Sequence, residues 1–111
     1  MSLRSILRSF CFTPNTIRYR VEWPRLAEAW SRIGGVGTLF DGGAGSGEFA
    51  RRALQEDLCR DVVALEHDAG NFRQLERNLG RDPRAKLLRG SVLEIPLPDR
   101  SVDMVLSTQV I

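Results

Sequence analysis

Residues 36–50 read VGTLFDGGAGSGEFA and contain the signals of a strand, a tight turn and a helix in succession. A short apolar run that ends at Phe40 is typical of a buried strand. Asp41 follows it, and a glycine cluster comes before the helical pattern that begins at Glu48. Glycine permits sharp turns and leaves no Cβ between the backbone and a ligand. This order of elements indicates the first unit of a nucleotide-binding α/β fold.

The spacing of the glycines limits the kind of nucleotide that could bind. Position 48 is Glu where the dinucleotide fingerprint G-x-G-x-x-G, counted from Gly43, needs its third glycine. A P-loop needs Gly-Lys-Ser/Thr, and the residue after Gly47 is acidic. The hydrolase elbow G-x-S-x-G also fails, because Ser46 lacks glycines two positions before and after it. Asp41 and Glu48 place negative charge on both sides of the loop, which opposes a pyrophosphate and suits a cationic ligand such as S-adenosylmethionine (SAM).

Residues 39–47 resemble motif I of the class I SAM-dependent methyltransferases, which has an Asp-x-Gly-x-Gly-x-Gly run at this point. The resemblance implies that SAM is the cofactor and that this loop holds its methionine portion. The residues implied are Asp41, Gly42, Gly43, Ala44, Gly45 and Gly47.

A second acidic residue follows at a matching interval. Residues 61–66 read DVVALE, a continuous apolar run that predicts a strand buried on both faces and ending at Glu66. Glu66 lies 19 residues after Gly47, close to the interval expected for an acid at the end of the second strand. A carboxylate can accept a hydrogen bond from each of two ribose hydroxyls. By the same resemblance Glu66 is the ribose-binding acid, and His67 is a contact to the adenine.

Residues 90–107 carry the second specific motif. The runs IPLPD at 95–99 and SVD at 101–103 resemble the connection into strand four of the small-molecule, methyltransferase type 11-like members of the family. The adenine-recognising acid of the family falls on Ser91, whose hydroxyl makes a weaker hydrogen bond than a carboxylate. Ser91, Val92 and Ser107 complete the expected cofactor contacts. We expect Asp103, just before strand four, to be structural, and no catalytic base can be named.

Periodicity predicts the remaining elements. Helices are expected over 24–33, 48–58 and 69–79, the last capped by Asp68, and a third strand over 85–90. The first of these helices has Pro24 in its first turn. Its expected apolar face is Leu26, Ala29, Trp30 and Ile33, and we expect Trp23 and Trp30 to pack in the core.

The first twelve residues leave three interpretations open. Leu3, Ile6, Leu7 and Phe10 have the spacing of one apolar helix face, and the polar residues beside them are Ser and Arg. A helix of this kind can pack on the domain or form a lid, can be a mitochondrial transit peptide, or can contact a membrane surface or nucleic acid.

The resemblance implies a Rossmann-like three-layer αβα sandwich with a parallel sheet of about four strands in the order 3-2-1-4. We expect residues 1–35 to be an N-terminal helical segment and residues 36–111 to be the N-terminal half of a SAM-binding domain. The family fold has more strands, so the apolar fourth strand would lie at an unpaired edge. Truncation, or a partner chain that completes the sheet, would account for this.

Composition limits the class of protein. With 111 residues, 42% of them apolar and 27% charged, the chain corresponds to one ordinary globular domain. Cys11 and Cys59 match no metal-ligand spacing, and no apolar run has the length of a membrane span. Residues 1–20 carry a net charge of +4, and the remainder of the chain carries a net charge of −2. We therefore expect a cytoplasmic protein with no metal, membrane or nucleic-acid partner.

The expected activity is transfer of the SAM methyl group to an unidentified small-molecule acceptor. Absence of an Asn-Pro-Pro-Tyr run after strand four argues against the enzymes that methylate amino groups of DNA and proteins. Two alternatives are a non-catalytic SAM-binding module and an NAD-type dinucleotide-binding oxidoreductase domain.

Overall fold

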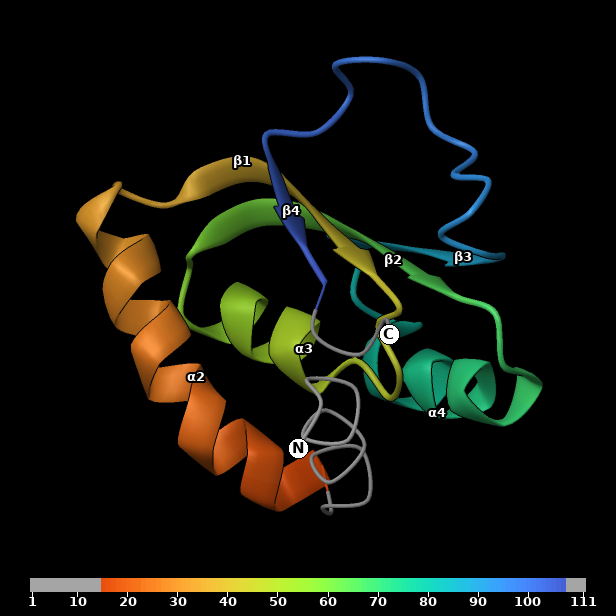
Figure 1. Cartoon of the computed structure of the whole chain (residues 1–111), viewed down its shortest axis with the longest axis horizontal. Helices are drawn as coiled ribbons and strands as arrows, with labels where there is room; N and C mark the ends of the chain where they lie inside the picture. Colours follow the sequence, from red (N-terminus) through yellow and green to blue (C-terminus); the bar gives the residue numbers. More distant parts are fainter. Residues whose placement is uncertain (1–14, 108–111) are drawn as a thin grey trace, which may run out of the picture.

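A parallel sheet of four strands forms the centre of the protein in this computed structural model, which describes the backbone of residues 15–107 and the side chains of residues 23–107 (Figure 1). The sheet has the order β3-β2-β1-β4, as predicted, and every pairing is parallel. Its strands are β1 Val36–Gly42, β2 Cys59–Glu66, β3 Ala85–Arg89 and β4 Met104–Leu106. The fold is therefore the expected Rossmann-like α/β type. The predicted helix over residues 2–12 lies outside the described residues.

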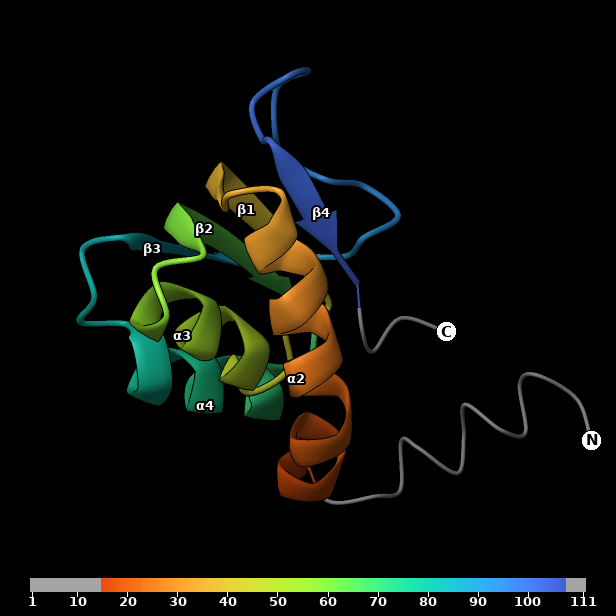
Figure 2. The ribbon, with the colours of Figure 1, turned by 90° about the vertical axis from the view of Figure 1, so that its left-hand side faces the viewer.

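The described helices all lie on one side of this sheet (Figures 1 and 2). They are α2 Asn15–Arg32, α3 Glu48–Gln55 and α4 Ala69–Leu79, with α2 beside α3. The connection from β3 to β4 leaves the sheet on the side away from these helices (Figure 2). Because parallel strands need crossover connections, α3 and α4 are the links from β1 to β2 and from β2 to β3.

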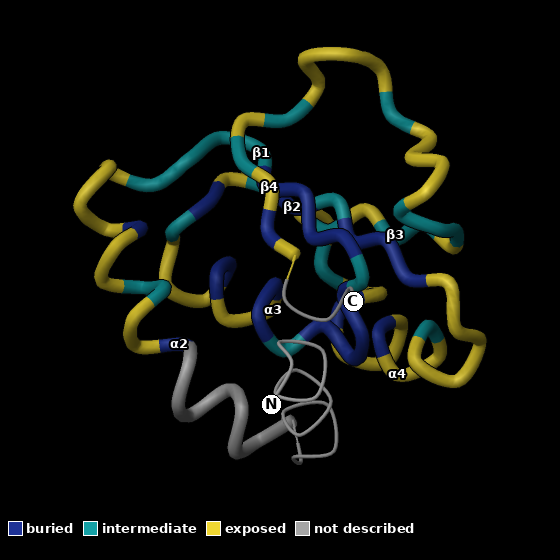
Figure 3. Tube along the Cα trace, viewed as in Figure 1, coloured by how far each residue is buried: buried dark blue, intermediate teal, exposed yellow. Residues whose placement is uncertain are grey.

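The core lies between the sheet and the helices. Leu39, Val62 and Ala64 are buried on the helix side of the sheet and join a cluster with Phe49 and Leu54 of α3. Figure 3 shows this buried zone along β1, β2 and the inner turns of α3. Strand alternation places Asp41 and Glu66 on this same face, because they lie two residues after Leu39 and Ala64.

The prediction for α2 was wrong in its start and in part of its buried face, although Trp23 and Trp30 are in the core as predicted. The helix begins at Asn15, nine residues before Pro24, which lies inside it. Among the described side chains of α2, the buried stripe contains Trp23, Leu26, Ala27 and Trp30, whereas Ala29 is exposed and Ile33 is 63% exposed. A proline is common at a helix start but can also lie within a helix whose tertiary contacts compensate for the lost hydrogen bond. Here the indole N–H of Trp23 donates to Oε2 of Glu56 at 2.8 Å, which ties α2 to the end of α3.

Two other boundaries also shifted. Helix α3 ends at Gln55 instead of residue 58, and β2 begins at Cys59 instead of residue 61. The cause is Asp57, whose φ of 54° reverses the chain directly after the helix. Strand pairing then starts early, with Val36 opposite Cys59. Helix α4 has the predicted bounds, and Asp68 caps it by accepting a 2.9 Å hydrogen bond from the backbone N–H of Asn71.

Glycine at position 47 is required by both conformation and space. Gly47 has φ 86°, and a Cβ placed on it would lie 2.6 Å from Cδ1 of Leu75. This absent side chain lets the start of α3 rest directly on α4.

We expect Gly47→Ala to lower the free energy of unfolding by about 3 kcal/mol, from left-handed strain of about 1 kcal/mol plus overpacking. Gly34→Ala is the matched control, because Gly34 has φ 79° but nothing within 4 Å of its added Cβ, so it should lose about 1 kcal/mol. Urea denaturation measures both values. Equal losses in the two variants would show that contact with α4 does not constrain the loop.

Candidate functional site

The carboxyl ends of the strands bring the predicted residues to one edge of the sheet. Asp41 lies opposite Ala64 and Leu106, and Glu66 lies opposite Arg89. The two acids are therefore near the ends of neighbouring strands and on the same face. This arrangement is the one that a ligand spanning both carboxylates requires.

The glycine loop adopts a conformation that other residues rarely take. Gly43, Gly45 and Gly47 all have positive φ, between 60° and 86°. The backbone N–H groups of Gly43 and Ala44 both donate to the carbonyl oxygen of Leu65 at 2.9 Å. These bonds fold the loop back over the end of β2 and bring it beside Glu66.

Glu66 is held in place from two sides. The backbone N–H of Gly45 donates to its Oε1 at 2.9 Å, and the backbone N–H of Asp68 donates to its Oε2 at 2.8 Å. The residue is only 4% exposed. Each oxygen has a second lone pair, so the two amides leave acceptor capacity for a hydroxyl. The carboxylate thus positions the glycine loop and remains able to accept from a ligand.

Asp41 has no comparable compensation. It is 1% exposed, and its Oδ1 has no hydrogen-bond partner within the described part of the chain. Burial, together with the nearby charge of Glu66, raises the pKa of Asp41 to about 7. An uncompensated buried carboxylate is costly and occurs mainly where a ligand or a chemical step needs it. A ligand that brings positive charge or a hydrogen-bond donor to this atom would remove the cost.

The segment after β3 completes the edge on the other face of the sheet. The backbone N–H of Gly90 donates to the carbonyl oxygen of Glu66 at 3.1 Å. A Cβ placed on Gly42 would lie 3.1 Å from Cε1 of Phe40 and 3.2 Å from Cγ1 of Val92, so the glycine gives both side chains room for a close approach. The hydroxyl of Ser91 accepts a 3.1 Å bond from the backbone N–H of Leu93 and thereby stabilises its own turn.

The structure thus brings together Asp41, Glu66, the glycine loop and Val92, and it leaves two predicted residues at the margin. The side chain of His67 is 78% exposed, although its Nδ1 lies 3.6 Å from Oε2 of Glu66. Ser107 is exposed, one residue beyond the end of β4. The cofactor contacts of all eleven predicted residues stay predictions.

Two residues with supporting roles did not emerge from the sequence. Asp68 was expected only as a helix cap, but its backbone N–H orients Glu66. Asn78 donates from Nδ2 to the carbonyl oxygen of Ser46 at 2.7 Å and fixes the loop to α4. In the sequence, only the position of Asn78, one helical turn from a buried leucine, pointed to this role. Asp103 is structural as expected, because its Oδ2 accepts a 2.7 Å bond from the backbone N–H of Thr38, far from the loop end of β1.

Metal sites and membrane spans are both absent from the described residues. These residues contain no group of three or more His, Cys, Asp or Glu side chains that could hold a metal ion. None of their helices combines the length and apolar character needed to span a membrane.

The parallel sheet, the glycine loop and the two strand-end acids are the features typical of nucleotide-binding α/β domains. A family model described as a methyltransferase domain matches residues 40–111. The chain therefore belongs to this methyltransferase family, which confirms the resemblance seen in its motifs.

Individual relatives agree with this assignment. A Mycolicibacterium smegmatis protein named as an S-adenosylmethionine-dependent methyltransferase is 36% identical over 94 residues, which cover 85% of this chain and 33% of the relative. A solved structure from Pyrococcus horikoshii, described as that of a candidate RNA methyltransferase, is 30% identical with a TM-score of 0.61 and covers 74% of this chain and 39% of its own. A structure from Methanococcus maripaludis, described as that of a candidate SAM-dependent methyltransferase, shares the fold with a TM-score of 0.64 at 24% identity, over 73% and 38% of the two chains. The chain spans about a third of the length of the first relative.

The burial of Asp41 gives a prediction for stability against pH. An acid whose pKa rises on folding binds its proton more tightly in the folded state, so its contribution to the free energy of unfolding is present below its unfolded pKa of about 4 and is lost as pH rises toward 7. We expect Asp41→Asn to be more stable than the parent chain at pH 8 by up to about 4 kcal/mol, and the difference should shrink toward pH 4. Urea denaturation at several pH values measures it.

The exposed Asp99→Asn serves as control and should show no such pH-dependent difference. A stability difference for Asp41→Asn that does not change between pH 4 and pH 8 would contradict the assigned ionisation.

Proposed function

We propose that this chain binds SAM at the carboxyl edge of its sheet and provides the cofactor-binding part of a methyltransferase. The observation that carries the proposal is Asp41, a buried carboxyl with an unpartnered oxygen, within the described residues, beside a glycine loop. SAM is a small nucleoside whose methionine end carries a sulfonium and an ammonium group. The positive charge of SAM therefore suits Asp41, the carboxyl group at this edge that has an oxygen without a hydrogen-bond partner among the described residues.

The residues would divide the ligand between them. Asp41 and the loop from Gly43 to Gly47 would hold the methionine portion, and Glu66 would accept from the ribose hydroxyls. Val92 would contact the adenine across the open backbone of Gly42, with Ser91 beside it and with His67 and Ser107 at the margin. Support for this division comes from the short approach of Val92 to Gly42 and from the locked position of Glu66.

Methyl transfer from SAM needs little covalent catalysis by the protein. When bound, SAM supplies an electrophilic methyl group on a positively charged sulfur. The residues of this chain would orient that end through Asp41 and keep the adenosine end fixed through Glu66. Positioning of this kind accounts for much of the acceleration of a two-reactant transfer. No residue of the chain is assigned as a general base.

Two classes of methyl acceptor are considered. The resemblance of residues 95–103 to small-molecule enzymes favours a small-molecule acceptor. The Pyrococcus horikoshii structure, which is 30% identical and is described as that of a candidate RNA methyltransferase, favours RNA as the second class. For either acceptor we propose the same division of the chain. Residues 1–35 would form a helical segment, and residues 36–111 would form the cofactor-binding half. We also propose that the protein is in the cytoplasm.

Calorimetric titration with SAM, and separately with NAD, tests the cofactor. We expect saturable binding of SAM only, and Asp41→Asn and Glu66→Gln should each weaken it about tenfold, as the loss of one charge-assisted hydrogen bond would. Glu94→Gln removes one exposed charge just after β3 and should leave the affinity unchanged. Saturable NAD binding without SAM binding would contradict the proposal. Mass spectrometry of candidate acceptors incubated with SAM separates an enzyme from a non-catalytic SAM-binding module.

Affinity should depend on pH in a defined direction. The pKa of Asp41 is about 7 in the free protein, and a cationic ligand favours the ionised carboxylate. The Kd for SAM should therefore increase by up to about tenfold for each pH unit below 7. In Asp41→Asn the Kd should stay constant between pH 7 and pH 5.5. A parent chain with a constant Kd over this range would show that Asp41 does not face the cationic end.

A further inference from the structure

The described surface divides its charge unevenly between two parts of the molecule. Residues 69–89, which form α4, β3 and the turn between them, contain six basic and two acidic residues, a net charge of +4. The other residues from 23 to 107 contain six basic and eleven acidic residues, a net charge of −5. The overall charge of +2 and a count by halves of the sequence both hide this separation.

Five of the six basic residues in this segment are exposed and make no ion pair within the described part of the chain. We call them the basic edge: Arg73, Arg77, Arg81, Lys86 and Arg89. The sixth, Arg84, is paired with Asp82 at 2.9 Å. Most other described arginines are paired too, such as Arg51 with Glu48 at 2.8 Å.

The basic edge has a regular spacing. Arg73 and Arg77 are four residues apart on α4, and Arg81 continues the interval just past its end. Four residues correspond to about 6 Å along a helix, so Arg73 and Arg77 form one row on the side away from the buried Leu75 and Leu79, and Arg81 follows the end of the helix. Glu76 is the one acidic residue of α4 and lies to the side of this row.

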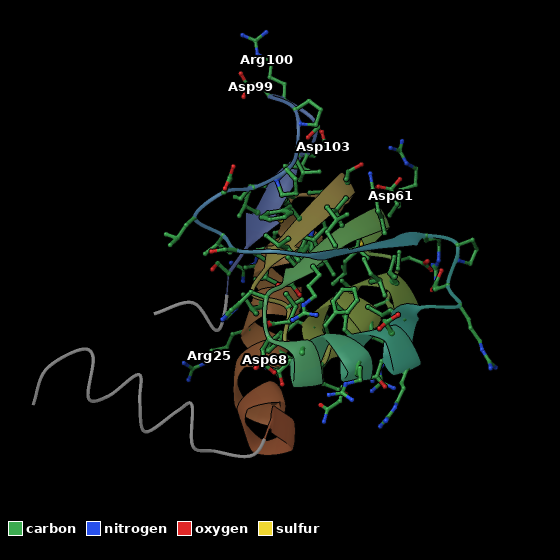
Figure 4. The ribbon with its side chains drawn as sticks, turned by 90° about the vertical axis from the view of Figure 1, so that its right-hand side faces the viewer. Arg25, Asp61, Asp68, Asp99, Arg100 and Asp103 are labelled. Atoms are coloured by element: carbon green, nitrogen blue, oxygen red, sulfur yellow. The ribbon has the colours of Figure 1, made fainter. Side chains whose placement is uncertain are left out.

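The row leads toward the proposed cofactor site. Helix α4 lies beside β3, and Figure 4 shows the two together on one side of the molecule. Arg89 ends β3, lies on the same sheet face as Ala85 and Leu87, which pack on the core, and is the register partner of Glu66. Lys86 is also on this edge strand, but strand alternation places it on the opposite face of the sheet. Positive charge therefore extends from the outer face of α4 to the strand ends where Glu66 is held.

We propose that the basic edge binds the phosphate backbone of a single strand of RNA and directs it toward the carboxyl edge of the sheet. Arginine matches phosphate with a planar fork of donors, and a row of them follows a linear polyanion. Among the described residues, the exposed large apolar side chains are Ile33, Leu93, Ile95 and Val105, none of them in the basic edge, so this surface offers nothing for membrane insertion. The proposal replaces the expectation of no nucleic-acid partner, and it deepens the proposed function by choosing between its two acceptor classes.

Fluorescence anisotropy with a labelled oligouridine strand tests this surface without any need for methyl transfer. We expect the logarithm of the binding constant to fall linearly with the logarithm of salt concentration. Arg73→Gln/Arg77→Gln should weaken binding and reduce that slope by about 1.4, which corresponds to two lost phosphate contacts on a single strand. The matched control is Arg25→Gln/Arg100→Gln, which removes two exposed arginines that lie on α2 and on the β3–β4 connection (Figure 4). The control should leave the slope unchanged.

Three results would overturn the proposal: no saturable RNA binding, equal loss in the two double variants, or binding to phosphatidylserine vesicles but not to RNA. The outcome is separable from that of the cofactor titration. SAM binding without RNA binding removes only this inference, and RNA binding without SAM binding removes the proposed function while the basic edge stands.

Discussion

One carboxylate organises the proposed site. Glu66 accepts from Gly45 with one oxygen and from Asp68 with the other, so it joins the glycine loop to the end of β2 and to the start of α4. The loop can take this course because three of its glycines have positive φ. A substitution of any of them would place strain at the point where the loop meets Glu66. The conformation of the glycine loop and the position of Glu66 therefore depend on each other.

The cost of this arrangement falls on Asp41. Two carboxyl groups lie near each other at a buried edge, and within the described part of the chain only Glu66 is compensated by amides. The folded chain thus keeps an unfavourable charge that a cationic ligand would relieve. Destabilising groups of this kind are concentrated at functional sites, where ligand binding regains the free energy that their burial costs.

The parts of the fold and site that follow from local chemistry were predictable. The glycine spacing, the apolar strand 61–66 and the interval to Glu66 were enough to predict the edge where the acids meet, and the resemblance to the family implied the strand order. The start of α2 was not predictable, because Pro24 reads as a helix start and only the packing of Trp23 on α3 shows otherwise. The bond from Asn78 to the loop and the burial of Asp41 depend on tertiary contacts between distant residues. The positive charge of residues 69–89 can be counted from the sequence, but that five of its six basic side chains are exposed and without an ion pair among the described residues required the structure.

The ionisation of Asp41 is the most direct test of this account. NMR of the side-chain carboxyl carbons reports the pKa of Asp41 in the free protein and in the presence of SAM. The account predicts a value near 7 in the free protein and a clear decrease on addition of SAM. An ordinary aspartate pKa near 4 that SAM does not change would contradict it.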